Sequence, residues 1–397
     1  PEIISNIFAE KKDSTFLVES PSGTSITYGN FLQEVRKAAT MLSEYGIKKG
    51  DRIAILLTNS LEIPILYFAC LLLEAVAVPI NQSLHPKEAR YILANSRAKV
   101  VLFSRCTRAL LLAAGEIKGC SQLRIGLRKE QNLHKHERED QGIDNWTGIE
   151  ADKKLPGFED LDPHSHFIIL YTSGTTGKPK GVIHSIFNEC LSALNYNKLM
   201  GFNSNARFLN NWSLAYSSGI LNALLCPFMA KGSTVISEPF NAKAALNFWE
   251  QIILHEINTL WLSPTMIASL NSLDRNPNGP DYASSKLTTV CCGTAPLKSS
   301  IKNTFERKYG IPVYESYGLS ETLFVSTHSK AFPPKNGSVG KVLEDIAISI
   351  NKTFGETPEK EGEIIVCAKT TMIDYTFGEN EEHNSVDRNK FPTGDLG

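Results

Sequence analysis

The strongest constraint on the fold is a repeated alternation between short apolar segments and segments with helical periodicity. Residues 28–45 carry apolar side chains at helical spacing, and residues 52–57 then form an almost uninterrupted apolar run. The alternation continues with a helical segment at 63–73, an apolar one at 76–80, a helical one at 86–95 and an apolar one at 100–103. Strands buried on both faces read as continuous apolar runs, and parallel neighbours need crossover helices. The pattern therefore predicts a mostly parallel, helix-covered sheet.

The same alternation resumes in the second half of the chain. Its apolar segments there are residues 167–171, 234–236, 259–262 and 288–292. After about residue 312 the pattern changes, because short apolar segments at 346–350 and 363–367 are separated by glycine and proline. Such spacing is typical of a small β-rich unit. We therefore expect an α/β fold with two helix-covered, mostly parallel β-sheet subdomains and a small β-rich subdomain.

The length of the chain also favours several units, since 397 residues exceed what a single hydrophobic core usually serves. We place the predicted subdomains at residues 1–166, 167–311 and 312–397. Residues 121–166 are mostly polar and predict a connector or surface excursion at the end of the first unit. His134 and His136 lie in this stretch, but no third ligand accompanies them, so a solvated loop is favoured over a metal site.

Composition excludes several classes of protein. Lysine and arginine number 41 and aspartate and glutamate 42, so the net charge of −1 gives no general attraction to nucleic acid. The most apolar stretch, residues 63–73, is shorter than the ~20 residues of a membrane-spanning helix. The eight cysteines contain no C-x-x-C pair, which favours buried, reduced thiols over a zinc or redox site. We expect a cytoplasmic protein with no membrane span and no nucleic-acid partner; the sequence does not indicate the oligomeric state.

A segment rich in glycine and hydroxyl groups follows the strand predicted at 167–171. Residues 171–181 read YTSGTTGKPKG, with three glycines, four serine or threonine hydroxyls, two lysines and no acidic residue. Glycines let backbone N–H groups turn toward a bound anion, and hydroxyls and lysines add donors and positive charge. This composition predicts a binding loop for a polyphosphate.

Two other interpretations of the segment remain open. The first is an ordinary turn after a strand. The second is a Walker-type loop, which needs four residues between its glycines and a hydroxyl residue after its lysine. Only Thr175 and Thr176 separate Gly174 from Gly177, and Pro179 follows Lys178. Because the magnesium-binding hydroxyl is missing, a P-loop kinase is disfavoured.

The segment resembles the phosphate-loop signature of the adenylate-forming, or AMP-binding, superfamily. That superfamily contains acyl- and aryl-CoA synthetases, peptide-synthetase adenylation domains and luciferases. Further segments resemble its other motifs in the same order: residues 50–54 with 77–81, 292–297, 314–322, 362–366 and 393–397. The resemblance covers nearly the whole chain and implies the large N-terminal domain of an acyl- or aryl-CoA synthetase. It also implies that the small β-rich subdomain is a distorted barrel.

The resemblance implies a role for each residue around the nucleotide. Lys180, Ser320 and Glu321 would be the catalytic residues, with Ser320 on the α-phosphate and Glu321 as the Mg²⁺ ligand. Asp395 would bind the ribose hydroxyls of ATP. The β- and γ-phosphates would be held by Thr172, Ser173, Gly174, Thr175, Thr176 and Lys180. The adenine would be framed by Gly293, Thr294, Ala295, Pro296, Glu315, Ser316 and Tyr317.

The carboxylic acid substrate would lie beside residues 211–219. The residues implied there are Trp212, Tyr216, Ser217, Gly219 and, from the nucleotide motif, Gly318. Tyr216 stands where relatives more often carry histidine, and both Trp212 and Tyr216 could equally be core aromatics. No aspartate occurs between residues 167 and 273, which disfavours an α-amino acid substrate, although Glu238 could replace it.

The resemblance implies ATP-dependent formation of an acyl-adenylate, release of pyrophosphate and transfer of the acyl group to a thiol. The thiol would belong to CoA or to the phosphopantetheine of an acyl carrier protein. The sequence stops two residues after Asp395, whereas full-length relatives continue into a small C-terminal domain that carries an assisting lysine. We therefore expect weak adenylation by this chain alone. An amino-acid-activating domain of a peptide synthetase and a non-catalytic nucleotide-binding module remain alternatives.

Overall fold

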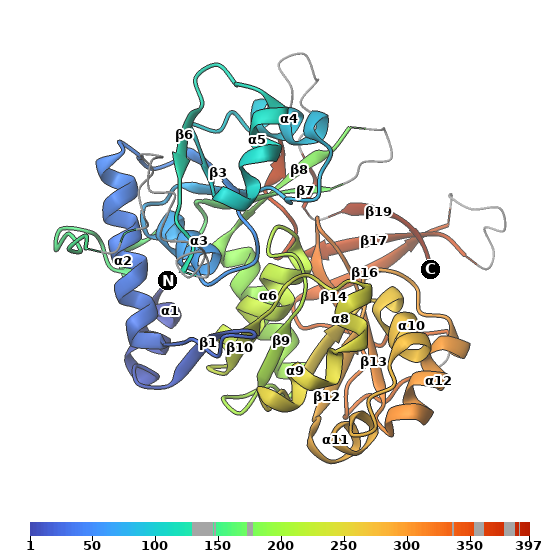
Figure 1. Cartoon of the computed structure of the whole chain (residues 1–397). Coiled ribbons are helices and arrows are strands. Elements are labelled where there is room, and N and C mark those ends of the chain that lie inside the picture. The colour runs from blue at the N-terminus through green and yellow to red at the C-terminus, as the bar shows by residue number, and fades with distance from the viewer. Residues whose placement is uncertain are drawn as a thin grey trace.

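Most of the chain has a defined place in the computed structural model (Figure 1), which describes residues 1–128, 146, 148–172, 178–335, 337–352, 361–376, 386–388 and 390–397. The strands are β1 Thr15–Glu19, β2 Ser25–Thr27, β3 Arg52–Leu56, β4 Val76–Pro79, β5 Val100–Phe103, β6 Ser121–Arg124, β7 His166–Thr172, β8 Lys180–Ser185, β9 Arg207–Asn210, β10 Ser233–Ile236, β11 Thr259–Leu262, β12 Thr289–Cys292, β13 Val313–Leu319, β14 Leu323–Thr327, β15 Lys341–Val342, β16 Ile346–Asn351, β17 Glu363–Ala368, β18 Asp374–Tyr375 and β19 Phe391–Leu396. The helices are α1 Glu2–Glu10, α2 Tyr28–Glu44, α3 Glu62–Leu72, α4 Pro86–Asn95, η1 Arg105–Thr107, α5 Arg108–Ala114, η3 Phe158–Asp160, α6 Ile186–Met200, the π-helix η4 Ser218–Leu225, α7 Cys226–Met229, α8 Ala242–Leu246, α9 Phe248–Leu254, α10 Pro264–Leu273, α11 Gly279–Lys286 and α12 Ser299–Tyr309.

A seven-stranded sheet carries the first run of alternating strands and helices. Its order among the described residues is β18-β8-β7-β4-β3-β5-β6. The pairs from β6 through β5, β3 and β4 to β7 are parallel, whereas β8 is antiparallel to both β7 and β18. The parallel sheet expected from the apolar runs is therefore confirmed, with an antiparallel edge at β8 and β18.

A nine-stranded sheet holds the second run, in the order β15-β14-β13-β12-β11-β9-β10-β1-β2. The pairs from β1 through β10, β9, β11 and β12 to β13 are parallel, and the two ends of the sheet are antiparallel. The N-terminal hairpin β1–β2 thus joins strands from the middle of the chain, and β7–β8 join strands from its first quarter. The boundaries predicted at residues 166 and 311 divide the chain into subdomains. No observation tests whether these subdomains are separable, so the boundaries stay a prediction.

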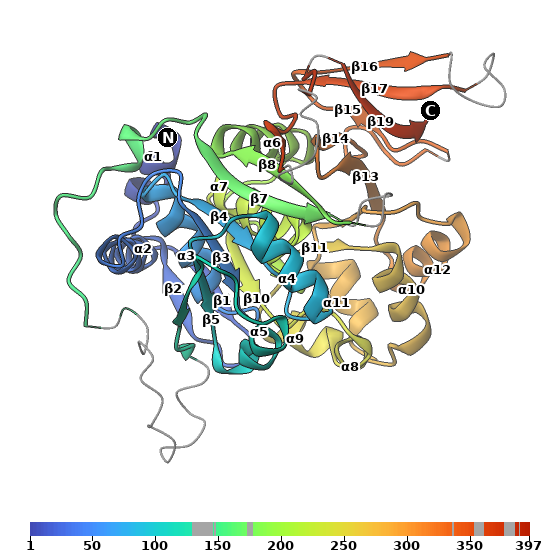
Figure 2. The same ribbon diagram turned by 90° about the horizontal axis from the view of Figure 1, so that it is seen from above.

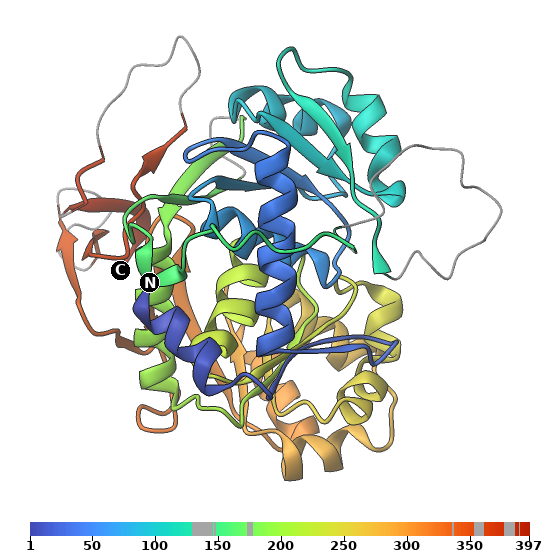
Figure 3. The same cartoon turned by 90° about the vertical axis from the view of Figure 1, so that its left-hand side faces the viewer.

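Strand side chains divide between three cores because successive residues point to opposite faces of a sheet. Leu17 of β1 packs into the core between the two sheets, which contains α2, α3 and α6, while the next residue, Val18, packs into the core under α9–α12. Likewise Ile53 of β3 faces the inner core and Ala54 the outer core under α4 and α5. Helix α3 is buried along its whole length, which explains why its apolar run is continuous. Figure 3 shows α2, in blue, lying across one side of this layered body.

The β-rich end of the chain forms a separate three-stranded antiparallel sheet, β16-β17-β19. Figures 1 and 2 both place this sheet at one side of the body, beside the β13–β14 hairpin. Val366 and Ala368 of β17 pack against Val325 of β14 and so attach the small sheet to the nine-stranded one. The small β-rich unit expected near the end of the chain is therefore present as an antiparallel sheet, although β13–β15, which also follow residue 312, belong to the nine-stranded sheet.

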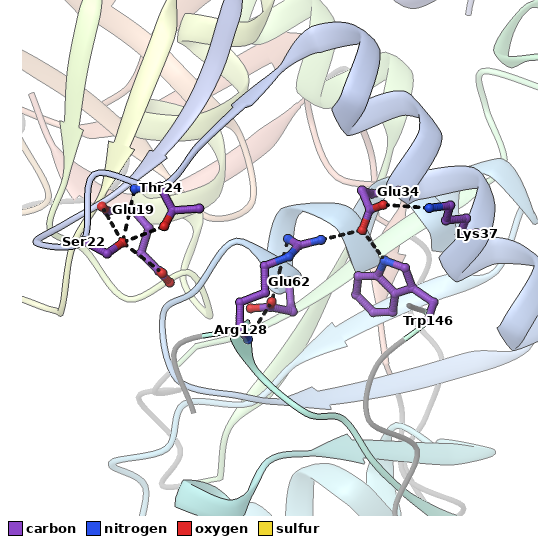
Figure 4. Close-up of polar contacts among 8 residues, drawn as sticks. All are labelled: Glu19, Ser22, Thr24, Glu34, Lys37, Glu62, Arg128 and Trp146. Carbon is purple, nitrogen blue, oxygen red and sulfur yellow. Dashed lines mark hydrogen bonds and ion pairs between the residues drawn. The ribbon is translucent and has the colours of Figure 1, made fainter. Parts of the chain in front are cut away.

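The prediction of an irregular connector from residue 121 is wrong for its first residues, because β6 extends the seven-stranded sheet in parallel with β5. Leu123 is the one buried residue of this edge strand, so no apolar run marks it in the sequence. Beyond it, Glu34 of α2 accepts hydrogen bonds from Arg128 and from Trp146, at 2.9 Å for the indole (Figure 4). These bonds attach Arg128 and Trp146, two described residues of the predicted connector, to α2. His134 and His136 lie outside the described residues.

All eight cysteines are free, and five of them are buried: Cys70, Cys190, Cys226, Cys291 and Cys292. Burial raises the pKa of the Cys291 thiol to about 12, so it stays protonated at neutral pH. Within the described ranges, no helix is long and apolar enough to cross a membrane, and no group of three or more acidic, cysteine or histidine side chains could hold a metal ion.

Candidate active site

A cleft of about 970 Å³ opens between the β7–β8 edge of the seven-stranded sheet, the β13–β14 turn and the small sheet. Its lining contains residues that the sequence assigned separately to phosphate, metal and adenine: Thr172, Lys180, Thr294, Ser316, Tyr317, Ser320 and Glu321. Tyr216, Ser217 and Gly318, assigned to the acid, also line it. Segments about 140 positions apart in the chain thus share one cleft.

The other predicted site residues either are not described or do not line the cleft. Ser173, Gly174, Thr175 and Thr176 fall outside the described residues. The remaining ones are described but do not appear in the cleft lining: Gly293, Ala295, Pro296, Glu315, Trp212, Gly219 and Asp395. Their positions next to lining residues are described below.

The β13–β14 turn presents Ser320 and Glu321, and a buried histidine supports it. His184 Nε2 lies 2.6 Å from the carbonyl oxygen of Ser320, so the ring nitrogen donates to this carbonyl. Burial lowers the pKa of His184 to about 4, although its bond to Ser320 opposes that shift. The imidazole is therefore neutral at physiological pH. The turn is also fixed by the amide of Met372, which donates to the Glu321 carbonyl at 2.7 Å.

The carboxylate of Glu321 accepts a hydrogen bond from the hydroxyl of Tyr375, at 2.9 Å on Oε1. Burial and the neighbouring Glu321 charge raise the pKa of Tyr375, so this hydroxyl remains a donor. On the other side, the Lys180 ammonium lies 5.5 Å from the centroid of the Tyr375 ring, within cation–π range. One aromatic side chain therefore contacts both the predicted phosphate lysine and the predicted metal ligand.

Tyr317 connects the nucleotide motif to the last strand. Its hydroxyl donates to Asp395 Oδ2 at 2.7 Å, across 78 positions of sequence. Burial is the largest cause of the raised pKa of Tyr317, and the Asp395 bond adds to it. Because its ring lines the cleft, Tyr317 offers a flat apolar face there, and Asp395 lies directly behind its hydroxyl.

The turn after β12 is tightly packed. A Cβ on Gly293 would lie 2.5 Å from the Trp261 ring and 2.9 Å from the Ser316 carbonyl, so only glycine fits there. Thr294 follows with a φ of 74°, a left-handed conformation that is uncommon for a β-branched residue. Ala295 and Pro296 are exposed beside it.

The side chains of Glu315 and Ser316 fix strand β13 just before Tyr317. Glu315 forms a 2.8 Å ion pair with Lys302 of α12, so its carboxylate is occupied on the side away from the cleft. The hydroxyl of Ser316 lies 2.9 Å from the Tyr196 hydroxyl and 2.8 Å from the Thr327 hydroxyl. These contacts hold the nucleotide motif from behind.

The acid side of the cleft is less constrained. Tyr216 has 42% of its surface exposed, and Ser217 lies beside it at the start of the π-helix η4. Leu221 and Asn222 of this helix also line the cleft. π-Helical turns are rare and occur frequently at functional sites.

Trp212 and Gly219 support this side from outside the lining. The Trp212 indole donates to the Trp261 carbonyl at 2.7 Å, and its ring contacts the Trp261 ring edge-on, at 6.1 Å. Trp212 packs against two hydrophobic cores, in agreement with the core interpretation of this residue. A Cβ on Gly219 would lie 2.3 Å from the Ser213 carbonyl, so this glycine is required by close backbone packing.

Among the residues that sequence reasoning missed, His184 and Tyr375 contact the predicted catalytic residues directly. His184 is four residues after Lys180 on one strand, so side-chain alternation places both on the same face, and that spacing could have found it. Tyr375 has no such signal. It reaches the cleft because β18 pairs with β8, with Tyr375 opposite Val182, and this pairing joins distant parts of the chain.

The residues present fit a magnesium–polyphosphate group. Tyr375 occupies Oε1 of Glu321, and among the described residues no donor is found on Oε2, so one carboxylate oxygen remains for a hard cation. Phosphate oxygens and water are hard oxygen ligands that could complete the coordination of such a cation. Lys180 supplies a positive charge at the same cleft for such a group.

The structure is that of a large α/β protein. It has two mixed sheets with helices between and outside them, and a polar cleft beside a small antiparallel sheet. The chain belongs to the AMP-binding enzyme family, whose profile matches residues 6–376. This match confirms the family expected from the sequence motifs.

Relatives with known names agree with this assignment. The chain is 29% identical over 377 residues to 2-succinylbenzoate–CoA ligase of Bacillus licheniformis, covering 94% of this chain and 72% of the relative. It is 27% identical over 371 residues to oxalate–CoA ligase of Arabidopsis thaliana, covering 91% and 69%. The inhibitor-bound N-terminal domain of FACL13 from Mycobacterium tuberculosis superimposes with a TM-score of 0.81 at 22% identity, over 100% of this chain and 95% of that one. This last likeness confirms the fold class.

Proposed function

We propose that the chain activates a carboxylic acid with ATP, forming an acyl-adenylate and pyrophosphate, for transfer to the thiol of CoA. The carboxylate oxygen of the acid would attack the α-phosphorus of ATP, and the bond from that phosphorus to the pyrophosphate oxygen would break. Both reactants are anions, so catalysis needs positioning and positive charge rather than a protein nucleophile.

Each side of the cleft has a part in this proposal. Lys180, with Thr172 and the adjoining Ser173–Thr176 segment, would bind the β- and γ-phosphates. Ser320 would contact the α-phosphate. Glu321 would hold Mg²⁺, whose positive charge would offset the negative charge of the phosphates. Tyr317 would stack on the adenine in the frame made by Gly293–Pro296, Glu315 and Ser316, and Asp395 would bind the ribose.

The observation that carries the proposal is the shared cleft. Thr172 and Lys180 at the β7–β8 edge and Tyr317, Ser320 and Glu321 of the β13–β14 hairpin line the same space. Phosphate-binding charge, a carboxylate for a cation and an aromatic face for a base are thereby combined within a volume of about 970 Å³. A cleft of this size fits a nucleotide together with an organic acid.

We propose a largely apolar acid as the substrate, bound beside Tyr216, Ser217 and Gly318, with Trp212 and Gly219 as support. Leu221 and Trp261 line this part of the cleft, and Glu238 does not. An α-amino acid is therefore disfavoured, because Glu238, the residue that could have replaced the missing aspartate, does not line the cleft where an ammonium group would lie. The phosphopantetheine of a carrier protein is a second possible thiol acceptor. Adenylation by these 397 residues alone is expected to be slow.

Mass spectrometry of the products tests the proposal directly. The chain at high concentration is incubated with ATP, Mg²⁺ and a mixed library of aliphatic, aromatic and amino acids, and the bound fraction is analysed. We expect an acyl-adenylate of one apolar acid, whose acyl group moves to CoA when CoA is added. An aminoacyl-adenylate would favour an amino-acid-activating domain. ATP binding without any adenylate would favour a non-catalytic nucleotide-binding module.

A further inference from the structure

Tyr375 lies between two opposite charges of the cleft. Its hydroxyl is 2.9 Å from Glu321 Oε1, and its ring centroid is 5.5 Å from Lys180 Nζ. All three side chains line the cleft, but they come from three separate strands or turns. The contact of one aromatic residue with both charges is therefore a product of the fold and not of local sequence.

The position of Tyr375 is fixed by its backbone. Strand β18 pairs antiparallel to β8, with Tyr375 opposite Val182, and the amide of Thr376 donates to the Gly181 carbonyl at 2.7 Å. The Thr376 hydroxyl is bonded in turn to Asn95, at 2.9 Å. Because these contacts hold Gly181 and Val182, the two residues that follow Lys180, in register with β18, the Tyr375 ring has a defined place relative to the ammonium group.

A direct ion pair between Lys180 and Glu321 would disable both groups. Across the part of the chain that the structure describes, no ion pair joins these two side chains. If they did pair, the ammonium would be neutralised before a phosphate arrived and the carboxylate before a cation arrived. The neutral tyrosine gives each charge a partner that does not cancel it, since a ring face attracts the cation and a hydroxyl donates to the anion.

We propose that Tyr375 is a positioning residue that keeps Lys180 and Glu321 apart and turns the Glu321 carboxylate toward a magnesium ion. With Oε1 bonded to the tyrosine hydroxyl, Oε2 is the oxygen left for the cation. This inference rests on the proposed function, because it takes Glu321 as a magnesium ligand and Lys180 as a phosphate ligand. Tyr375 itself contacts neither reactant in this account.

The test measures ATP binding by calorimetry, with and without Mg²⁺, on the 397-residue chain. Its readout is the ratio of the two dissociation constants, which reports the share of ATP affinity that depends on magnesium. Tyr375→Phe removes the hydroxyl and keeps the ring over Lys180. We expect the magnesium-dependent part of the ATP affinity to fall by roughly tenfold or more in this variant, as for loss of a hydrogen bond to a charged group. The ATP affinity in the absence of Mg²⁺ should be unchanged.

Tyr375→Leu separates the two contacts further. It removes the ring as well as the hydroxyl, so Lys180 becomes able to pair with Glu321. We expect ATP affinity to fall at least another threefold both with and without Mg²⁺, because the ammonium is then withdrawn from the phosphates. Equal behaviour of the Phe and Leu variants would overturn the part of the proposal that concerns Lys180.

Tyr309→Phe is the matched control, since the Tyr309 hydroxyl also donates to a carboxylate, that of Asp274, at 2.7 Å, in the core away from the cleft. It should lower the melting temperature without changing the magnesium ratio. In a Glu321→Gln background, Tyr375→Phe should have no further effect on that ratio, because both act through one carboxylate.

The outcomes separate this inference from the function on which it rests. If the wild-type chain binds ATP in a magnesium-dependent way and Tyr375→Phe keeps the same ratio, the positioning role is wrong and the proposed function stands. If the wild-type chain binds no ATP at all, the proposed function fails, and the inference fails with it. A purely structural role for Tyr375 would lower thermal stability, as in Tyr309→Phe, and leave the ratio unchanged.

Discussion

The two sides of the cleft differ in how firmly their residues are held. On the nucleotide side, Tyr317, Ser316 and Ser320 each have a hydrogen-bonded partner on another element. On the acid side, Tyr216 is 42% exposed and Ser217 stands at the first turn of a π-helix. A preformed nucleotide side suits ATP, which is the same reactant whatever the acid. The acid side is held less firmly, so it can be altered without loss of the fold.

This comparison predicts that substitutions on the nucleotide side reduce catalysis or stability, and that those on the acid side change selectivity. The largest effect is expected for Glu321→Gln. Loss of the proposed magnesium ligand should lower the rate of acyl-adenylate formation by roughly 10²–10³-fold in a single-turnover assay, because charge stabilisation at the phosphates is the main catalytic term. Glu88→Gln is the control, since Glu88 also lines the cleft but caps helix α4. Equal losses in the two variants would contradict the metal assignment.

The next effect concerns the ion pair behind the adenine site. Lys302→Met leaves the Glu315 carboxylate partly buried without its partner, and breaking such a pair costs about 3 kcal/mol of unfolding free energy. Chemical denaturation should show this loss, and the KM for ATP should rise. The double variant Lys302→Met, Glu315→Met should recover stability. If it also recovered the KM for ATP, Glu315 would have no role in placing the adenine.

A smaller and different effect is expected on the acid side. Tyr216→Ala should change the ratio of kcat/KM between a small and a bulky apolar acid by about tenfold, as expected for altered pocket contacts, with the KM for ATP changed by less than twofold. A panel of acids assayed under the same ATP concentration measures both values. Loss of ATP binding in this variant would break the division between the two sides.

An effect on stability alone should come from Glu189 of α6, which is fully buried and has no hydrogen-bond partner among the described residues. Burial raises its pKa from the ordinary 4.5 to about 8, so the folded state binds a proton that the unfolded state releases between those values. Its contribution to stability must therefore fall as the pH rises from about 5 to 8. Glu189→Gln should remove this slope, measured as the difference in unfolding free energy between the variant and the wild type at pH 5, 7 and 9. A pH-independent difference would contradict the burial of an ionisable group.

Much of the fold could be predicted because burial leaves a clear pattern in the sequence. Residues 86–95, 100–103 and 259–262 were expected as they occur in α4, β5 and β11. The pairing of β1 with β10 and of β18 with β8 could not be predicted, because nothing local in these segments specifies a partner more than 190 positions away. Strand β6 was missed since its single buried residue gives no run.

The candidate site shows the same limit. Motifs along the chain indicated Lys180, Tyr317, Ser320 and Glu321, and these residues line one cleft. The contacts that hold them came from residues without a motif, such as Tyr375, whose place depends on strand pairing. The pocket for the acid is set by packing of exposed side chains such as Tyr216, for which periodicity carries no information.

A crystal structure of the chain with ATP and Mg²⁺ tests the central claim most directly. We expect the adenine against the Tyr317 ring, the ribose hydroxyls within hydrogen-bond distance of Asp395, and the terminal phosphates beside Lys180 with a metal ion on Glu321. Electron density for the nucleotide outside this cleft, or with its phosphates pointing away from Lys180 and Glu321, would contradict the account.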